Sequence, residues 1–254
     1  MIDVKNLWHH FQIKPILKDI NLTINKGELL CIMGSNGCGK STLLSTIGGL
    51  INPLKGEVYV NEIKRWESEE NEMAVRKNLY YLPYEQYFPI FPTGREYLYT
   101  VGDIYGIDSF QVLEHIESLA KLYHFEKVID SSITNYSTGQ KKKLAIASAL
   151  ISEVDTFILD EPFSGGLDSS ALNVTARILK ELADNKDKTV LMAVPVPELV
   201  EPIADRVAIM HEGEIIACDS PANLCKENNC ETLNDVLEHY LNPDMESILE
   251  GYLK

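Results

Sequence analysis

Short apolar runs, separated by glycine and proline turns, recur along this chain and predict buried strands that alternate with helices. Apolar and polar residues alternate over 2–8 and 20–24, a pattern typical of half-buried strands. Residues 28–33 are apolar almost throughout, as expected of a strand that is covered on both faces. The same signals predict further strands at 56–60, 79–82, 154–159 and 189–194.

From residue 93 to about 132 the spacing of apolar residues becomes that of helices. Val112, Ile116 and Leu119 recur at helical intervals, and turn signals lie at Gly106 and Asp108. A helix is also predicted over 169–182, followed by a hairpin within 205–219 and a helical, acidic tail from about 220. Strands and helices in βαβ order predict an α/β protein with a helical insertion.

Length and charge narrow the possible partners. The chain has 254 residues, 45% of them hydrophobic and 24% charged, which suits one α/β domain with a small subdomain. With 23 basic against 38 acidic residues, its formal net charge of −15 argues against nucleic acid or an anionic membrane surface as a partner. The basic run Lys141-Lys142-Lys143 is interpreted as a solvated helix face.

Cysteine usage and hydropathy indicate where the chain works. The 5 cysteines show no CxxC spacing, which favours a reduced, cytosolic compartment. Too few ligands accompany Cys225 and Cys230 for a zinc site. We recognise no signal peptide, and no apolar run reaches the ~18 residues of a membrane span. A separate chain must therefore span the membrane if the protein works at one.

The stretch GSNGCGKST, which follows the apolar run 28–33, carries the strongest chemical signal. A strand, a glycine loop and a helix in this order form the context of a phosphate-binding P-loop. A plain glycine turn before an ordinary helix is the alternative, but residue type, spacing and context together favour the P-loop. Its residues are Gly34, Ser35, Asn36, Gly37, Cys38, Gly39, Lys40, Ser41 and Thr42. Lys40 is expected to reach the β- and γ-phosphates and Ser41 to ligate Mg²⁺. The chain is therefore predicted to bind a nucleoside triphosphate.

Two carboxylates, Asp160 and Glu161, follow directly after an apolar run. The carboxyl end of a strand in a doubly wound sheet faces the ligand crevice. Asp160 is expected to hold Mg²⁺, through water, and Glu161 to act as a general base toward an attacking water. The alternative is that these two residues form an ordinary acidic turn at the end of a strand. The P-loop upstream favours the functional interpretation over this one.

The segment Tyr136-Ser137-Thr138-Gly139-Gln140 precedes a helical run that continues to residue 151. Alone, Ser137 and Gln140 would be interpreted as a capping box at a helix start. However, GSNGCGKST, YSTGQKKKLAIASAL and FILDEPFSGGLDSS, in that order, resemble the motifs of the ATP-binding subunits of ABC transporters. The resemblance covers nearly the whole chain.

This resemblance implies a P-loop NTPase core with a mixed sheet, an N-terminal antiparallel β-subdomain and an inserted helical subdomain. The implied divisions are a core of residues 1–92 and 133–219, a helical subdomain of 93–132 and a C-terminal helical tail of 220–254. The family forms head-to-tail dimers, which implies that Ser137, Gly139 and Gln140 contribute to the nucleotide site of the partner. Asp168 would cross the dimer interface. Phe11, in a polar stretch between the first two predicted strands, would stack on adenine.

Several positions depart from the family pattern. Tyr84 stands where a glutamine usually contacts Mg²⁺ and the transmembrane partner, and Gln86 could replace it only if the loop shifts. Pro195, which has no side-chain donor, stands where a histidine usually senses the γ-phosphate. Thr138 replaces a glycine, and 163–168 is one glycine longer than usual. Hydrolysis is expected to be slow, because one preorganised donor can be worth roughly 10²–10³-fold in rate.

The sequence therefore predicts the ATP-binding and hydrolysing subunit of an ABC transporter, with ATP and Mg²⁺ as cofactors. It would power a membrane-spanning permease from the cytoplasmic face, as a homodimer or a heterodimer. An exporter is favoured by segment 92–96 and the helical tail, which resemble exporter subunits. The permease is expected to dock beside 83–98, unless the aromatic side chains there belong to the core. These side chains are Tyr84, Tyr87, Phe88, Phe91 and Tyr97.

Two other functions stay open at this point. The first is a slow or inactive ATP-gated module that acts as the regulatory half of a heterodimer, suggested by Tyr84 and Pro195. The presence of Glu161 argues against it, because an inert site has no need of a base. The second is a soluble ABC ATPase that acts on ribosomes or DNA, which fits least well because the chain has one cassette and an acidic surface.

Overall fold

Strands and helices alternate along the chain in the computed structural model, which describes residues 1–11, 14–90, 92–186, 188–243 and 251–253. The strands are β1 (Ile2–Phe11), β2 (Lys14–Ile24), β3 (Leu29–Gly34), β4 (Lys55–Val60), β5 (Ile63–Lys64), β6 (Leu79–Leu82), β7 (Thr156–Asp160), β8 (Thr189–Ala193), β9 (Arg206–His211) and β10 (Glu214–Asp219). The helices are α1 (Lys40–Gly48), α2 (Glu69–Lys77), α3 (Gly94–Ile104), α4 (Ser109–Leu122), α5 (Thr138–Ile151), α6 (Ser169–Lys186), α7 (Pro197–Val200), α8 (Pro221–Glu227) and α9 (Leu233–Leu241).

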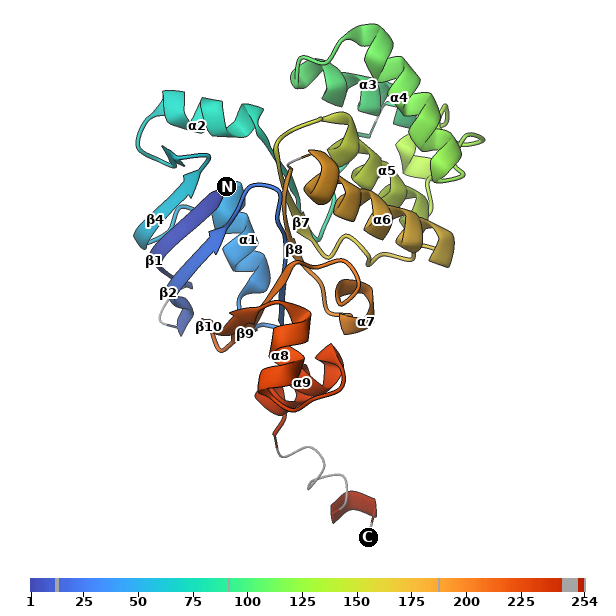
Figure 1. Ribbon diagram of the computed structural model, residues 1–254. Coiled ribbons are helices and arrows are strands. Elements are labelled where there is room, and N and C mark those ends of the chain that lie inside the picture. Colours follow the sequence, from blue (N-terminus) through green and yellow to red (C-terminus); the bar gives the residue numbers. More distant parts are fainter. Residues whose placement is uncertain (12–13, 91, 187, 244–250, 254) are drawn as a thin grey trace.

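Two sheets organise the molecule. The larger has the strand order β10-β9-β3-β8-β7-β6, in which the neighbours from β9 to β6 run parallel and β10 pairs antiparallel with β9. The smaller has the order β2-β1-β4-β5 and is antiparallel. Helix α1 lies between β1 and β2 on one side and β7 and β8 on the other (Figure 1). The predicted mixed sheet and antiparallel β-subdomain are confirmed.

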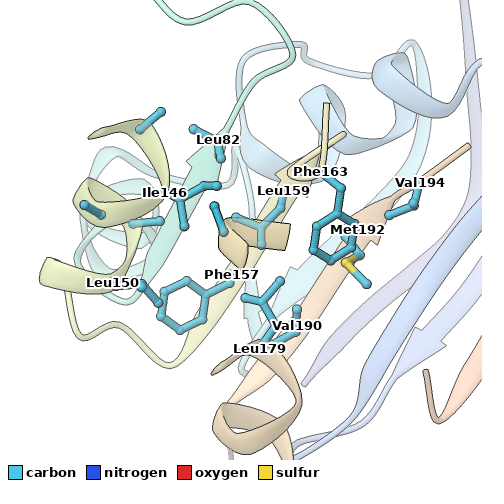
Figure 2. Close-up of a cluster of buried hydrophobic side chains, with 14 of the residues drawn as sticks. Leu82, Ile146, Leu150, Phe157, Leu159, Phe163, Leu179, Val190, Met192 and Val194 are labelled. Atoms are coloured by element: carbon cyan, nitrogen blue, oxygen red, sulfur yellow. The ribbon is translucent and has the colours of Figure 1, made fainter. Parts of the chain in front are cut away.

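Side chains of the larger sheet alternate between two cores, because successive residues of a strand point to opposite faces. In β7, Phe157 and Leu159 belong to the core shared with α5 and α6, whereas Ile158 belongs to the core shared with α1. Figure 2 shows the first of these cores, where Leu150 of α5 and Leu179 of α6 flank Phe157. The sheet is thus covered on both faces, as the apolar runs predict.

Helices α3 and α4 form the predicted helical insertion and lie beside α5 (Figure 1). Helix α3 begins with a capping box between Thr93 and Glu96. Val112, Ile116 and Leu119 are buried in the core that α4 shares with α5. The fold class is confirmed, while the exact division at residues 92, 132 and 219 stays a prediction.

Some elements differ from the sequence-based expectation. Strand β1 continues to Phe11, so this residue ends a strand and does not lie in an irregular polar stretch. Helix α6 runs four residues beyond the predicted end at 182. Helix α2 was not predicted, because Val75 is the one residue that it buries and its apolar period is correspondingly weak.

Candidate functional site

The glycine loop between β3 and α1 is shaped by close backbone contacts. Gly34, Gly37 and Gly39 have φ values of 153°, 79° and 114°, which residues with side chains rarely adopt. A Cβ on Gly34 would lie 2.1 Å from the carbonyl oxygen of Met210, and one on Gly39 would lie 2.8 Å from that of Ile16. Gly34 and Gly39 are therefore favoured by both backbone conformation and available space, and Gly37 by backbone conformation alone.

The ammonium of Lys40 lies inside the curve of this loop. It is 7% exposed, and its Nζ donates hydrogen bonds to the carbonyl oxygens of Gly34 (2.8 Å) and Ser35 (3.0 Å). Helix α1 begins at Lys40, and its N-cap, Gly39, has no side chain to cap the first N–H groups. An anion at this position would meet free amide donors, the positive helix end and the ammonium together.

Asp160 is the last residue of β7, at the same end of the larger sheet as the P-loop that follows β3. Its side chain is buried at 2% exposure. Burial raises the pKa of Asp160, while a hydrogen bond from Ser41 and the charges of Lys142 and Lys40 act in the opposite direction. A hydroxyl and a carboxylate provide the hard oxygen donors that Mg²⁺ prefers, so the residue types present fit this metal.

Glu161 stands in a strained backbone conformation directly after β7. Its φ is 47°, in the left-handed region, where a non-glycine residue costs about 1–3 kcal/mol. Its backbone N–H donates to Ala193 in β8 (2.9 Å), and its carbonyl accepts from the backbone N–H (3.1 Å) and the hydroxyl (2.9 Å) of Ser164. These bonds on both sides hold the strained turn in place.

Residues 137–140 form the start of helix α5. The Ser137 side chain accepts from the backbone N–H of Gln140 (3.2 Å), and the Gln140 side chain accepts from the backbone N–H of Ser137 (2.8 Å). The capping box is thus present, and it engages the side-chain oxygen of Gln140. Ser137 and Thr138 are exposed. Contact of Ser137, Gly139 and Gln140 with a partner's nucleotide stays a prediction.

The longer loop after Glu161 packs against this helix start. A Cβ on Gly139 would lie 2.5 Å from the carbonyl oxygen of Gly166, so only glycine fits at this contact. Gly165 and Gly166 have φ values of 85° and 79°. Asp168 accepts from Lys143 (2.6 Å) and from the backbone N–H of Ala171 (2.9 Å). Asp168 is therefore anchored within its own chain, and its place at a dimer interface stays a prediction.

The interpretation of Lys141-Lys142-Lys143 as a solvated face is wrong. Lys142 is 2% exposed, and Lys141 and Lys143 are partly buried. Consecutive helical residues are about 100° apart, so a run of three points in different directions. Because α5 packs against α3, α4 and the sheet, one member of the run is directed into the protein.

At the positions that depart from the family pattern, Tyr84, Gln86 and Pro195 do not present a side chain that replaces the expected contact to Mg²⁺ or to the γ-phosphate. Tyr84 is 54% exposed. The side-chain amide of Gln86 donates to the carbonyl oxygens of Pro83 (2.8 Å) and Tyr84 (2.6 Å), so it is engaged within its own loop. Pro195 is exposed, two residues beyond the end of β8.

Phe11 lies on the surface rather than in the core. It is 53% exposed, and its ring meets the edge of His9 with the ring centroids 4.8 Å apart. An exposed aromatic ring is free to stack on a planar ligand. Its contact with adenine stays a prediction.

A cavity of about 310 Å³ lies beside the P-loop and includes residues that the sequence reasoning missed. Lys18 of β2 donates its backbone N–H to the carbonyl of Gly213 (2.8 Å), which joins the smaller sheet to the β9–β10 turn. The lining consists of Lys14, Pro15, Ile16, Lys18, Ser35, Asn36, Gly37, Cys38, Glu212 and Gly213. No sequence motif marks Lys14 or Lys18, because tertiary pairing alone brings them to the loop.

Fold and site define an ATP-binding subunit of the ABC transporter class. The family model described as ABC transporter matches residues 17–164, and the chain belongs to this family. It is similar to the ABC transporter ATP-binding protein NatA of Bacillus subtilis, with 29% identity over 92% of this chain and 95% of the relative. An uncharacterised ABC transporter ATP-binding protein of Methanocaldococcus jannaschii is 32% identical over 93% and 82% of the two chains.

Solved structures resemble the chain over most of its length. A dimeric ATP-binding cassette in a post-hydrolysis state with ADP and Pi has a TM-score of 0.79 and 25% identity, over 87% of this chain and 98% of that one. CbiO1 of Clostridium perfringens, part of the ABC transporter complex CbiONQ, has a TM-score of 0.74 and 25% identity, over 98% of both chains. Similar relatives include an import protein for spermidine and putrescine of Clostridium novyi, 29% identical over 89% of this chain and 64% of its own. The exporter direction therefore stays a prediction.

Proposed function

We propose that this chain binds Mg²⁺–ATP at its P-loop, closes as a dimer around it and hydrolyses it slowly to drive a separate permease. The glycine loop around the buried Lys40 carries the proposal, because it places an ammonium and the uncapped N-terminus of α1 together at one position. The relatives and the dimeric cassette of similar fold support it.

In this proposal, each site residue has a role that its position supports. Lys40 and the N-terminal N–H groups of α1 hold the phosphates, and Ser41 and Asp160 hold the metal ion. Mg²⁺, when bound, neutralises charge that develops on the transferred phosphoryl group. Glu161 takes the proton of the attacking water as general base. Ser137, Gly139 and Gln140 complete the site of the partner subunit.

Turnover is slow in this proposal because donors around the γ-phosphate are missing. Pro195 has no side-chain donor, and the amide of Gln86 is engaged in its own loop. The loss of one preorganised donor costs about 10²–10³-fold in other enzymes.

The test is ATP hydrolysis by the purified chain over a range of protein concentration, with Glu161→Gln as the control. Activity that rises steeply with concentration and disappears in the variant supports a dimeric hydrolase. The absence of turnover above that of the variant, with ATP still bound, would contradict it. The chain would then act as an ATP-gated module, the regulatory half of a heterodimer, for which Pro195 and the engaged Gln86 are the supporting observations.

We further propose that the permease contacts the segment 83–98 and that the subunit lies on the cytoplasmic face of the membrane. Tyr84 and Tyr87 are 54% and 84% exposed, whereas Phe88 and Tyr97 pack edge to face with ring centroids 5.3 Å apart. The exposed pair is therefore available to a partner, and Phe91 lies outside the described residues. Within the described ranges, no helix combines the length and apolar character needed to cross a bilayer.

A further inference from the structure

His9 of β1 is a buried histidine to which the roles described above assign no function. It is 8% exposed, and neither of its ring nitrogens has a hydrogen-bond partner among the residues that the structure describes. Most buried polar groups in proteins are hydrogen-bonded, so an imidazole without such bonds calls for an explanation. Burial lowers the pKa of His9, and the neighbouring His10 acts in the same direction, which favours the neutral ring. Packing rather than hydrogen bonding therefore holds His9 in place.

The side chain of His9 lies on the face of the smaller sheet that is turned toward the P-loop. His9 pairs directly with Leu17 of β2, and opposite residues of an antiparallel pair present their side chains on the same face. Leu17 in turn reaches the P-loop, since a Cβ on Gly39 would lie 3.2 Å from one of its methyl carbons. His9 is thus buried on the same side of this sheet as the proposed nucleotide site.

Phe11 is the aromatic neighbour against which His9 packs. The two ring centroids are 4.8 Å apart and the ring planes are inclined by 78°, an edge-to-face arrangement that aromatic rings prefer. Phe11 is 53% exposed, so one part of its ring contacts His9 while the rest is open to solvent. An exposed side chain without such support samples several rotamers, and a ligand that stacks on it must restrict them. The contact with His9 removes part of that entropic cost before the ligand binds.

We propose that His9 is a positioning residue that holds the ring of Phe11 ready to stack on the base of the bound nucleotide. The inference rests on the proposed function, because it takes Phe11 as the contact for adenine. It goes beyond that function by assigning the preorganisation of this ring to a buried imidazole, which acts through Phe11 and not on the phosphates. The affinity that the base adds to that of the phosphates should therefore depend on His9.

The experiment compares ATP with inorganic tripolyphosphate, which carries the phosphates but neither ribose nor base. Dissociation constants for both ligands are determined in excess Mg²⁺ by competition with a fluorescent ATP analogue. The ratio of the two constants, tripolyphosphate over ATP, measures what the nucleoside adds to binding. Damage to the P-loop or to the fold weakens both ligands alike, so a merely structural role of His9 leaves this ratio unchanged.

The variants are Phe11→Ala, His9→Ala, the double variant that combines these two changes, and His9→Phe, which keeps an aromatic ring at the position. His10→Ala is the matched control, because it removes an imidazole from the exposed neighbouring position. If His9→Ala does not fold, His9→Leu replaces it, since leucine fills the space without an aromatic ring.

The ratio is expected to fall about three-fold or more in His9→Ala, and at least as far in Phe11→Ala, because the edge-to-face contact is lost. His9→Phe and His10→Ala are expected to retain the wild-type ratio. Since His9 acts through Phe11, the double variant should have the same ratio as Phe11→Ala alone.

Three results would overturn parts of this account separately. An unchanged ratio in His9→Ala with a lower ratio in Phe11→Ala, or two effects that add in the double variant, overturns the positioning role and leaves the proposed function intact. An unchanged ratio in Phe11→Ala overturns the predicted contact with the base, and the inference with it. Failure of the wild-type chain to bind either ligand instead overturns the proposed function itself.

Discussion

Among the positions that depart from the family pattern, Pro195 has the most direct expected effect on the chemistry. Pro195 lies two residues after the end of β8. The last residue of that strand, Ala193, accepts a hydrogen bond from the backbone N–H of Glu161, the proposed general base. In the family pattern that the sequence resembles, a histidine usually stands in place of Pro195 and senses the γ-phosphate. In the proposed site, the residue at this position cannot donate a hydrogen bond from its side chain.

Restoring that donor is expected to accelerate hydrolysis. Pro195→His should raise kcat about ten-fold or more, because it returns a hydrogen-bond donor to the γ-phosphate region. Steady-state ATPase assays measure this, and Pro195→Ala serves as the control for loss of the proline ring alone. Equal rates in the two variants would show that the missing donor does not limit turnover.

The close packing around Gly139 predicts that a larger side chain there will destabilise the protein. Because a Cβ there would lie 2.5 Å from the carbonyl oxygen of Gly166, Gly139→Ala must displace the loop or the helix start. Overpacking of this kind costs about 1–3 kcal/mol, and the free energy of unfolding in urea should fall by that amount. Thr138→Ala, at the exposed neighbouring position, should leave stability nearly unchanged.

Among the elements, the last turn of α1 is linked to the segment after β5 by one buried guanidinium, which also forms an ion pair with α2. The side chain of Arg65, after β5, is 0% exposed and donates to the carbonyl of Ile47 near the end of α1 (2.5 Å). The same guanidinium donates to Glu72 of α2 through Nε (3.2 Å) and through one terminal nitrogen (2.7 Å). The P-loop helix is thereby tied at its far end to α2.

Breaking this pair should destabilise the protein strongly. Glu72→Gln is expected to lower the free energy of unfolding by about 3 kcal/mol at neutral pH, because Arg65 is left buried without its counter-charge. Urea unfolding measures the loss. Glu69→Gln, an exposed substitution in the first turn of the same helix, should have a small effect.

The same pair predicts a pH dependence. The hydrogen bond from Arg65 lowers the pKa of Glu72 below its usual 4.5. A carboxyl whose pKa is lower in the folded state stabilises the fold above its unfolded pKa, and this contribution is lost as the pH falls through the folded value. The stability difference between wild type and Glu72→Gln should therefore shrink below about pH 4.5, and a constant difference would contradict the assignment.

Much of this element structure could be predicted from sequence, and the exceptions have physical causes. The unbroken apolar run Phe157-Ile158-Leu159 marks a strand with two buried faces, since each face supplies an apolar core. Lys142 was misjudged because a run of like charges suggests solvent, whereas the turn of the helix directs this one residue into the protein. The contribution of Lys18 to the cavity depends on a contact between two sheets, and no local pattern encodes it.

For the whole molecule, net charge is expected to govern how two copies of the chain associate. Each chain has a formal net charge of −15, so two copies that approach each other experience repulsion that the bound nucleotide must overcome. Salt screens this repulsion and so favours association of the two copies. In contrast, salt weakens the binding of basic proteins to nucleic acid. Association of two copies should therefore respond to salt in the opposite direction from nucleic-acid binding.

Dimerisation of Glu161→Gln with ATP is expected to be tighter at high ionic strength. The Debye length falls from about 30 Å at 0.01 M to about 3 Å at 1 M, which removes most of the long-range repulsion. Sedimentation velocity at the two salt concentrations measures the effect, and samples with ADP provide the control. Weaker association at high salt would mean that local ion pairs across the interface outweigh the net charge.

The order of strands in the larger sheet has a consequence for the synthesis of the chain. Strand β3, which precedes the P-loop, pairs with β8 and β9, and both of these begin at or after residue 189. A growing chain on the ribosome therefore exposes the P-loop sequence early, while the strand before it still lacks both neighbours. The cavity beside the P-loop becomes complete only after Glu212 and Gly213, which line it, have emerged from the ribosome. Until then, the apolar residues of β3 depend on chaperones or on non-native contacts for protection from water.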